Sequence, residues 1–275
     1  MIARFSGALV RAILVVTVIA TPSLMLPSLN ADTAQIVALV ALFAGALTFF
    51  EYAAIYPGLV EFRDAPPFNR IRFVSLFMTV FLLSTVALAG DTPTTLTRFV
   101  EVLGAAMARS IDVPYSPVRL LVLMLPADAT PEHVAMVRTA GGLAYMISLI
   151  TLGYFVLIMR MIGWPNAQDG FNVWVNLPTF EPTAGADVVE RLRRDAWFNI
   201  ALGFLLPFLI PAALKAISLG FAPVTLQSPH TLIWTVTAWA FLPASLFMRG
   251  IAMGRVARMI EEKRRHSVAV DFAPA

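Results

Sequence analysis

Residues 130–162 have the sequence TPEHVAMVRTAGGLAYMISLITLGYFVLIMRMI, which combines a helix start with a long apolar run. Thr130 is a good N-cap, and Pro131 fits the first helical position, where its missing N–H is not needed. Between Gly141 and Arg160 the run carries no charged residue. We therefore expect one unbroken helix over 131–162, about 48 Å long at 1.5 Å per residue, that begins outside a bilayer and crosses it.

The same kind of apolar run recurs along the chain. Of the 275 residues, 59% are hydrophobic and only 13% are charged, whereas charged residues make up about a quarter of a typical soluble domain. In lipid the backbone must satisfy its own polar groups, which favours helices. The sequence thus predicts an all-α fold, a polytopic transmembrane helix bundle forming a single domain over 1–275. The six expected spans cover residues 7–29, 34–56, 73–90, 141–162, 197–219 and 231–253.

The first span has a second interpretation, because Arg4 precedes it and Val18-Ile19-Ala20 has the small-residue pattern of a signal-peptide cleavage site. Cleavage there would leave five spans. The apolar run continues past Ala20 to Leu29, however, so we expect a retained first helix.

The distribution of cations predicts the orientation, since Lys and Arg concentrate in cytoplasmic loops. With the N-terminus inside, fifteen of the twenty cations lie inside, and only Arg98, Arg109, Arg119, Arg138 and Lys215 lie outside. Both termini are therefore expected in the cytoplasm. Eighteen of the cations are Arg, and Ala is abundant, which indicates a GC-rich bacterial genome and hence a bacterial inner membrane.

Three connections are longer than a turn. In the outer region, 91–138, residues 94–111 place apolar side chains on one side at helical spacing, which predicts a helix lying in the membrane surface. These side chains are Leu96, Phe99, Val100, Leu103 and Met107. Residues 116–126 are too short to span the membrane and form either a re-entrant piece or a second surface helix.

The two long inner loops cover 57–72 and 163–195. Pro66-Pro67 predicts a stiff, extended centre for the first loop. Apolar residues alternate with polar ones over 171–177, which predicts a short extended piece, and Asp187 with Glu190 resembles a capping box at a helix start. The loop residues expected to contact lipids or partner subunits are Arg63, Arg70, Arg72 and Trp174.

Few residues in the spans are candidates for chemistry. Glu51 is the only acid in a span and could pair with Arg160 or Arg249, as a structural ion pair or as a proton or cation site. Pro207 and Pro211 mark the fifth span as flexible or broken, or else adjust its packing shape. Lys215 is expected to reach the headgroups. The hydroxyls of the third, fourth and sixth spans either pack between helices or line a pore.

Recognised catalytic and cofactor motifs are missing from the sequence. The chain has no Cys, its three His lie outside the spans, and neither metal-ligand spacing nor a phosphate-binding Gly-rich loop occurs. We expect no cofactor, no metal and no catalytic residue. The basic stretch 255–265 adjoins a span, so it indicates an inner-leaflet anchor rather than nucleic-acid binding.

These observations leave three functional hypotheses. The first is a non-enzymatic accessory, assembly or scaffold subunit of a larger membrane complex, in contact with membrane lipids and other subunits. The second is a small-solute transporter or channel that uses Glu51 and the Pro207/Pro211 helix. The third is a lipid-modifying enzyme that uses Asp169, Glu181 or Asp187.

Overall fold

The computed structural model describes residues 2–26, 31–63, 65–90, 92–165, 172–180, 187–218, 220 and 226–271, and within them all regular structure is helical. The helices are α1 (Ile2–Met25), α2 (Ala31–Ala53), α3 (Pro66–Leu88), α4 (Thr95–Ile111), α5 (Pro117–Leu123), α6 (Pro131–Ile162), α7 (Val173–Asn176), α8 (Val188–Ser218) and α9 (Pro229–Asp271). Of these described helices, α1, α2, α3, α6, α8 and α9 are long and apolar enough to cross a membrane. The chain is an all-α, multi-pass transmembrane protein, as the sequence predicts.

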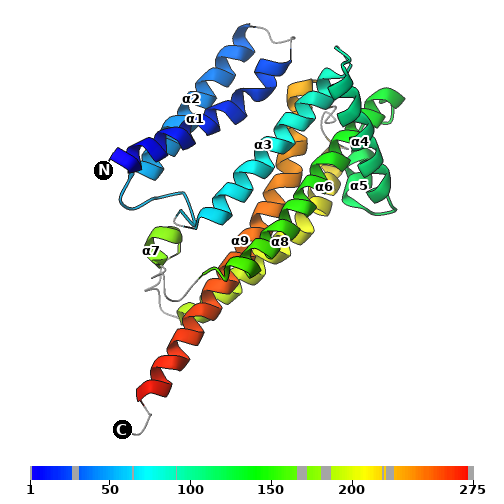
Figure 1. The fold of residues 1–275 in the computed structure, drawn as a ribbon. Helices are drawn as coiled ribbons and strands as arrows, with labels where there is room; N and C mark the ends of the chain where they lie inside the picture. Colours follow the sequence, from blue (N-terminus) through cyan, green and yellow to red (C-terminus); the bar gives the residue numbers. More distant parts are fainter. Residues whose placement is uncertain are drawn as a thin grey trace.

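The long helices run side by side, with α6 and α9 in the middle of the bundle (Figure 1). Helices α3, α4 and α5 pack on α6, and α8 packs on α9. Helix α1 packs on α2 and on α3. The beginning of α1 and the end of α9 lie at the same end of the bundle, which we term the terminal end, and α4 lies at the opposite end, the α4 end.

Two predicted helix starts are confirmed. The Thr130 hydroxyl accepts a hydrogen bond from the His133 N–H at 3.2 Å, and α6 runs unbroken until Gly163, whose φ of 66° ends it. The Arg191 N–H donates to the Asp187 carbonyl at 3.1 Å, so α8 begins immediately after Asp187 and continues into the fifth span.

Two loop predictions are wrong. Pro66 and Pro67 do not form an extended centre but open α3, because proline fits the first turn of a helix. The helix that contains the third span therefore begins at 66. Residues 173–176 form the helical turn α7 instead of an extended piece. There the Asn176 N–H donates to the Asn172 carbonyl at 3.1 Å, a local bond that the alternating pattern does not reveal.

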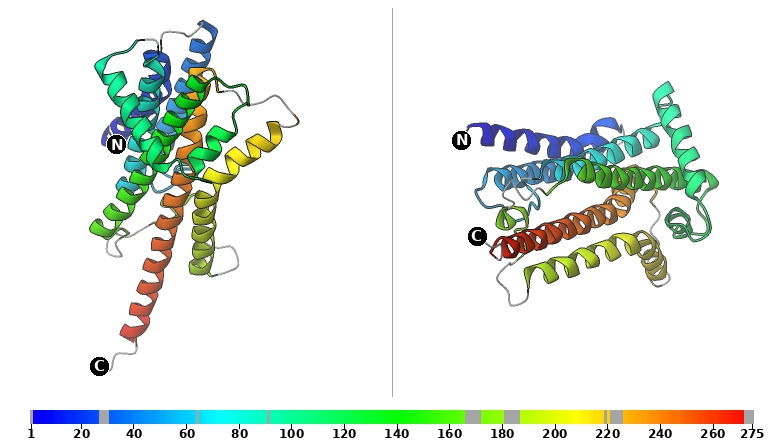
Figure 2. Two further views of the ribbon diagram at one scale, coloured as in Figure 1. Left: turned by 90° about the vertical axis from the view of Figure 1, so that its right-hand side faces the viewer. Right: turned by 60° about the horizontal axis from the view of Figure 1, so that its bottom comes forward.

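Helix α4 lies across the α4 end of the bundle, at a steep angle to α6 (Figure 2). This orientation fits the predicted surface helix. The buried residues of α4 are Thr97, Val100, Gly104 and Ala108, whereas Leu96, Phe99 and Leu103 are exposed. Small residues face α6 because the two backbones approach closely: a Cβ added to Gly142 would lie 2.4 Å from the Cα of Ala108.

Small and short polar residues also join the membrane helices. A Cβ on Gly203 of α8 would lie 2.7 Å from the Pro243 carbonyl oxygen of α9. The Thr151 hydroxyl of α6 donates to the Ser75 hydroxyl of α3, and the Ser148 hydroxyl donates to the Ala240 carbonyl of α9, both at 3.0 Å. These hydroxyls therefore join helices in the described bundle.

Candidate functional site

The most prominent polar contact at the terminal end joins Glu61 to Arg249. Glu61 lies in the loop before α3, and Arg249 lies twenty residues into α9. The Nε and Nη2 groups of Arg249 donate to the two carboxylate oxygens of Glu61 at 2.5 and 2.8 Å. The side chains are 14% and 26% exposed. This is a two-point pair shielded from water, which fixes the loop against the last membrane helix.

The same carboxylate joins the two inner loops. The Thr179 hydroxyl donates to Oε1 of Glu61 at 2.8 Å, and the Phe62 N–H donates to the Asn176 carbonyl at 2.6 Å. Phe62 is fully buried, and its ring centre lies 4.5 Å from that of Phe68. Segments 61–63 and 172–180 therefore form one packed cover over the terminal end of α3, α6 and α9.

The sequence analysis suggested that Glu51 pairs with Arg160 or Arg249, but in the structure it pairs with neither. Its carboxylate accepts hydrogen bonds from the N–H groups of Gly58, Leu59 and Val60 at 3.0, 2.8 and 3.0 Å. Arg160 lies exposed in the last turn of α6 and forms no ion pair with any residue that the structure describes. Glu51 thus orders the turn after α2 rather than joining helices.

Arg63 has a complementary role at the end of α2. Its guanidinium donates to the carbonyls of Ala54 and Ile55 at 2.7 and 3.1 Å. The last carbonyls of a helix lack partners within the helix, so Arg63 satisfies acceptors that would otherwise need water. Glu51 and Arg63 together hold the turn between α2 and α3 in one shape.

A cavity of about 330 Å³ lies between α1, α2 and α3 beside this turn. Its polar lining comes from Arg11, Thr48, Tyr52, Arg63, Asn69 and Arg70, and its apolar lining from Leu14, Val15, Phe73 and Val74. The guanidinium of Arg11 lies 4.6 Å from the centre of the Tyr52 ring. Arg72, the third arginine expected to contact lipid or a partner, is turned over the ring of Phe68 at 5.2 Å instead of lining the cavity.

Pro207 and Pro211 do not break α8, which continues through both. Pro211 has no N–H, so the Pro207 carbonyl lacks the hydrogen bond that it would normally accept within the helix. The indole of Trp239 donates to that carbonyl instead, at 3.0 Å.

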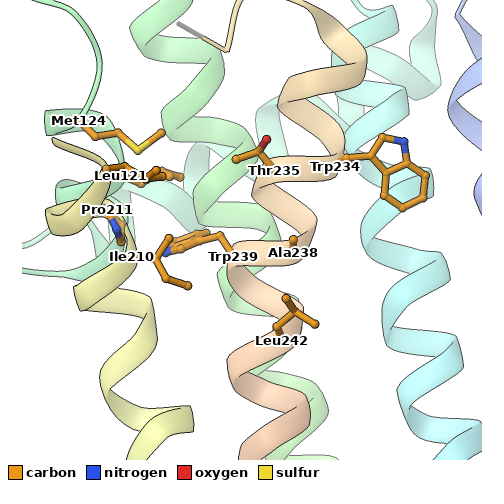
Figure 3. Close-up of a pocket in the computed structure, with 10 residues that line it drawn as sticks. Leu121, Met124, Ile210, Pro211, Trp234, Thr235, Ala238, Trp239 and Leu242 are labelled. Carbon is orange, nitrogen blue, oxygen red and sulfur yellow. The ribbon is translucent and has the colours of Figure 1, made fainter. Parts of the chain in front are cut away.

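A separate, mainly apolar cavity of about 380 Å³ lies beside Pro211, where Leu121, Met124, Ile210 and Trp239 gather (Figure 3). Pro207 and Pro211 lie on α8 and Glu51 on α2, two helices with no substantial contact, so the residues of the transporter hypothesis do not meet.

Ion pairs also join the outlying parts of α8 and α9 beyond the cover. Arg193 pairs with Glu261, and Arg264 pairs with Asp187 at 2.7 Å. A hydrogen bond from Arg264, followed by its charge and by backbone N–H bonds, lowers the pKa of Asp187. We term residues 187–196 and 254–266 the stalk. Asp187 therefore has a structural contact here, and Asp169 and Glu181 of the enzyme hypothesis lie outside the described residues, as does the side chain of Trp174.

At the α4 end Lys215 is exposed and contacts the segment after α5. Its ammonium donates to the Leu125 carbonyl at 3.2 Å. Asp112, at the end of α4, pairs with Arg119 at 2.7 Å and with Arg138 at 3.0 Å. Three of the five cations assigned to the outside thus fasten the segments of this end to one another.

The residues that sequence reasoning missed are Glu61, Thr179, Arg11, Tyr52 and Asn69. The signal for Glu61 is Arg249 itself, since a guanidinium within an apolar span requires an anion. The part of the chain that the structure describes contains no group of three or more His, Asp or Glu placed to hold a metal ion. No protein family, curated protein or solved structure matches this chain.

Proposed function

We propose that the chain is a non-enzymatic accessory, assembly or scaffold subunit of a larger complex in a bacterial inner membrane, and that α2 receives a membrane helix of a partner subunit. The observation that carries the proposal is the isolation of α2. It packs mainly on α1, and only 11% of its most apolar segment is buried. Leu39, Phe43 and Phe50 are more than 60% exposed.

Exposure alone is not the argument, because lipid tails solvate apolar side chains as well as protein does. Helices associate in membranes where small residues let their backbones approach. Ala34 and Ala38 are exposed on α2, and their spacing of four residues places them on one face near its start. The close contacts between α4 and α6 and between α8 and α9 use small residues in the same way.

Two further observations support the proposal. The hydroxyls of Ser75, Ser148 and Thr151 are used in helix contacts, which favours a packing role over a polar path for a solute. Most cations lie at the terminal end, which supports a cytoplasmic position for both termini.

Photocrosslinking in the native membrane tests this function. A photoreactive residue at Leu39 or Phe43 should yield a defined crosslinked partner polypeptide, and the same residue at Leu209, which is 52% exposed on α8, serves as the matched control. A partner crosslinked from α2 and copurified at a stoichiometric level would support the proposal. A chain that runs alone in mild detergent, with no crosslink from either α2 position, would refute it.

A further inference from the structure

Helix α8 bends away from α9 in its second half, the part that holds Pro207 and Pro211 (Figure 2). Proline bends a helix because it removes a backbone hydrogen bond and its ring presses on the preceding turn. The bend opens a wedge between α8 and α9, and α5 packs on α8 at the wide side of the wedge. The apolar cavity of about 380 Å³ that Figure 3 shows lies in this wedge.

Two hydrogen bonds hold the walls of this cavity together. The indole of Trp239 joins α9 to the Pro207 carbonyl of α8, and the ammonium of Lys215 joins α8 to the Leu125 carbonyl after α5. Trp239 itself lines the cavity, and Lys215 and Leu125 each directly follow a residue that lines it. These bonds tie the three helices around the cavity and place the ammonium of Lys215 at its edge.

The size of the cavity favours a lipid chain over a helix of another protein. One turn of α-helix with its side chains, roughly 10 Å wide and 5.4 Å long, fills about 420 Å³, which is more than the whole cavity. The lining of α9 extends from Trp234 to Leu242, about 12 Å along the axis. One leaflet of a bilayer holds roughly 15 Å of hydrocarbon, so the cavity is about one leaflet deep.

The cavity opens sideways, from a membrane span. Ala238 is exposed at the opening, and Leu242 is 54% exposed at the edge nearer the terminal end. Both residues lie in the part of α9 that is apolar enough to cross a membrane. An acyl chain can therefore enter from the bilayer without passing through the protein.

Two polar groups at the cavity have unused donors. The hydroxyl of Thr235 lines the cavity and forms no hydrogen bond with a described residue, whereas the hydroxyls of Thr79 and Thr85 donate to the carbonyl four residues earlier. Lys215 is exposed, uses one of its three donors for the Leu125 carbonyl and pairs with no described carboxylate. The cavity thus offers one cation at its edge and one neutral donor inside.

The stretch of chain around Lys215 has no acid of its own. Between Asp195 and Glu261 the sequence contains neither Asp nor Glu, so most of α8 and the adjoining half of α9 carry no carboxylate. At the same end of the bundle Asp112 already pairs with two arginines, and Asp128 is exposed and pairs with no described residue. The ammonium therefore keeps two donors for an anion at the membrane surface.

We propose that this cavity binds one acyl chain of an anionic glycerophospholipid from the leaflet at the α4 end. The lipid phosphate lies on Lys215, and the Thr235 hydroxyl donates to an ester carbonyl of the same lipid. The site differs from a basic surface that attracts lipids without ordering them, because a walled apolar hollow holds the chain. The site involves α5, α8 and α9, so it does not depend on the partner proposed for α2.

The test uses the full chain, purified and delipidated in an uncharged detergent. Phosphatidylglycerol and phosphatidylcholine with the same acyl chains are added separately, and binding is followed by native mass spectrometry and by the rise in Tm. We expect phosphatidylglycerol to bind about tenfold more tightly, as expected when one charge-assisted contact is added. Phosphatidylglycerol with a photoreactive group midway along one acyl chain should label residues 210–214 and 234–242.

Variants at exposed positions separate the chain contact from the headgroup contact. Ala238→Trp should fill the opening, abolish the labelling and weaken both lipids, whereas Ala216→Trp, on the opposite side of α8 from the lining residues, should change neither. Lys215→Gln should remove most of the preference for phosphatidylglycerol. Its control is Arg109→Gln, which removes an exposed cation from the last turn of α4. Thr235→Val should weaken ester-linked phosphatidylglycerol a few-fold and leave its ether-linked analogue unchanged.

Four results would overturn the proposal. Labelling that persists in Ala238→Trp would place the acyl chain elsewhere. A preference for phosphatidylglycerol that persists in Lys215→Gln would remove the headgroup from this cation, and an equal loss in Arg109→Gln would mean general surface attraction. A polypeptide crosslinked from a photoreactive residue at position 238 in the native membrane would mean that a protein, not a lipid, occupies the cavity.

Discussion

A guanidinium on a membrane helix needs an anionic partner, and for Arg249 that partner comes from a loop nearly 190 residues earlier in the chain. Removing one member of a shielded pair leaves the other charged and unpaired. The resulting loss of folding stability is larger than the stability that the intact pair contributes. Removing the Glu61 carboxylate would also take away the acceptor of the Thr179 hydroxyl and so loosen segment 172–180.

Arg249→Leu should therefore destabilise the protein by about 3 kcal/mol, measured by unfolding in sodium dodecyl sulfate. Adding Glu61→Leu should recover part of that loss, because no unpaired charge then remains. Arg98→Gln removes an exposed cation of α4 without a described ion pair and should change little. Additive effects of Arg249→Leu and Glu61→Leu would contradict the pairing.

The indole of Trp239 offers a second test, because its acceptor is a carbonyl that proline has freed. Trp239→Phe should cost about 1 kcal/mol for the lost hydrogen bond, in addition to any packing loss. In a Pro211→Ala background the restored N–H of residue 211 can satisfy the Pro207 carbonyl, so the hydrogen-bond share of the cost should disappear. An equal cost in both backgrounds would show that the indole contributes packing alone.

At the scale of single residues, the sequence predicts little of the candidate site. Glu51 was the obvious partner for a membrane arginine, because it is the only acid in a span, yet its carboxylate is used by three local N–H groups. Glu61 lies in a loop, and only the folding of that loop against α9 brings it to Arg249. Local spacing carries no information about such a return of the chain.

Helix boundaries are the best predicted features at the scale of elements. Thr130 and Asp187 mark helix starts by bonds within one turn, so the local sequence is sufficient. The prediction at Pro66 was wrong because proline both begins helices and occurs in extended loops. The apolar spacing of α4 gave no prediction of the residues that pack on α6, because close approach to α6 selects small residues over large apolar ones.

Two glycines of α6 provide a test of that contact and its control, because replacing them by Ala should change the folding stability in opposite directions. Gly142→Ala places a Cβ 2.4 Å from Ala108, so we expect a loss of about 1–3 kcal/mol as α4 and α6 separate. Gly153→Ala adds a Cβ with nothing within 4 Å, so it should stabilise the helix by roughly 0.5–1 kcal/mol. Thermal unfolding of the two variants measures both values, and a stabilising Gly142→Ala would rule out the close approach.

Most cations of the molecule lie at the end where α1 begins and α9 ends, which predicts a topology that labelling can check. The chain has no Cys, so single cysteines report cleanly. Asp128→Cys, exposed at the α4 end, should react in intact cells with a reagent that cannot cross the membrane. Arg258→Cys, exposed in the stalk, should react only after permeabilisation. The reverse pattern would invert the orientation.

Hydropathy predicts the six spans of this molecule well, because each is a long run that must satisfy its own backbone. It does not predict how the helices assemble. The packing of α6 on α3, α4, α5 and α9 depends on a few small or polar residues, such as Gly142, Ser148 and Thr151, whose partners lie far away in the sequence.

Helix α9 has 43 residues and is about 65 Å long, roughly twice the thickness of the hydrocarbon core. Arg264 and Arg265 lie about 23 Å beyond Arg249 along the axis, and they pair with Asp187 and Glu261 respectively. Arg264 thus joins the basic stretch to the start of α8, and the contact of this stretch with lipid stays a prediction. Because Pro243 lies about 42 Å from Asp271, a change of about 10° in the axis at Pro243 would sweep the tip through about 7 Å.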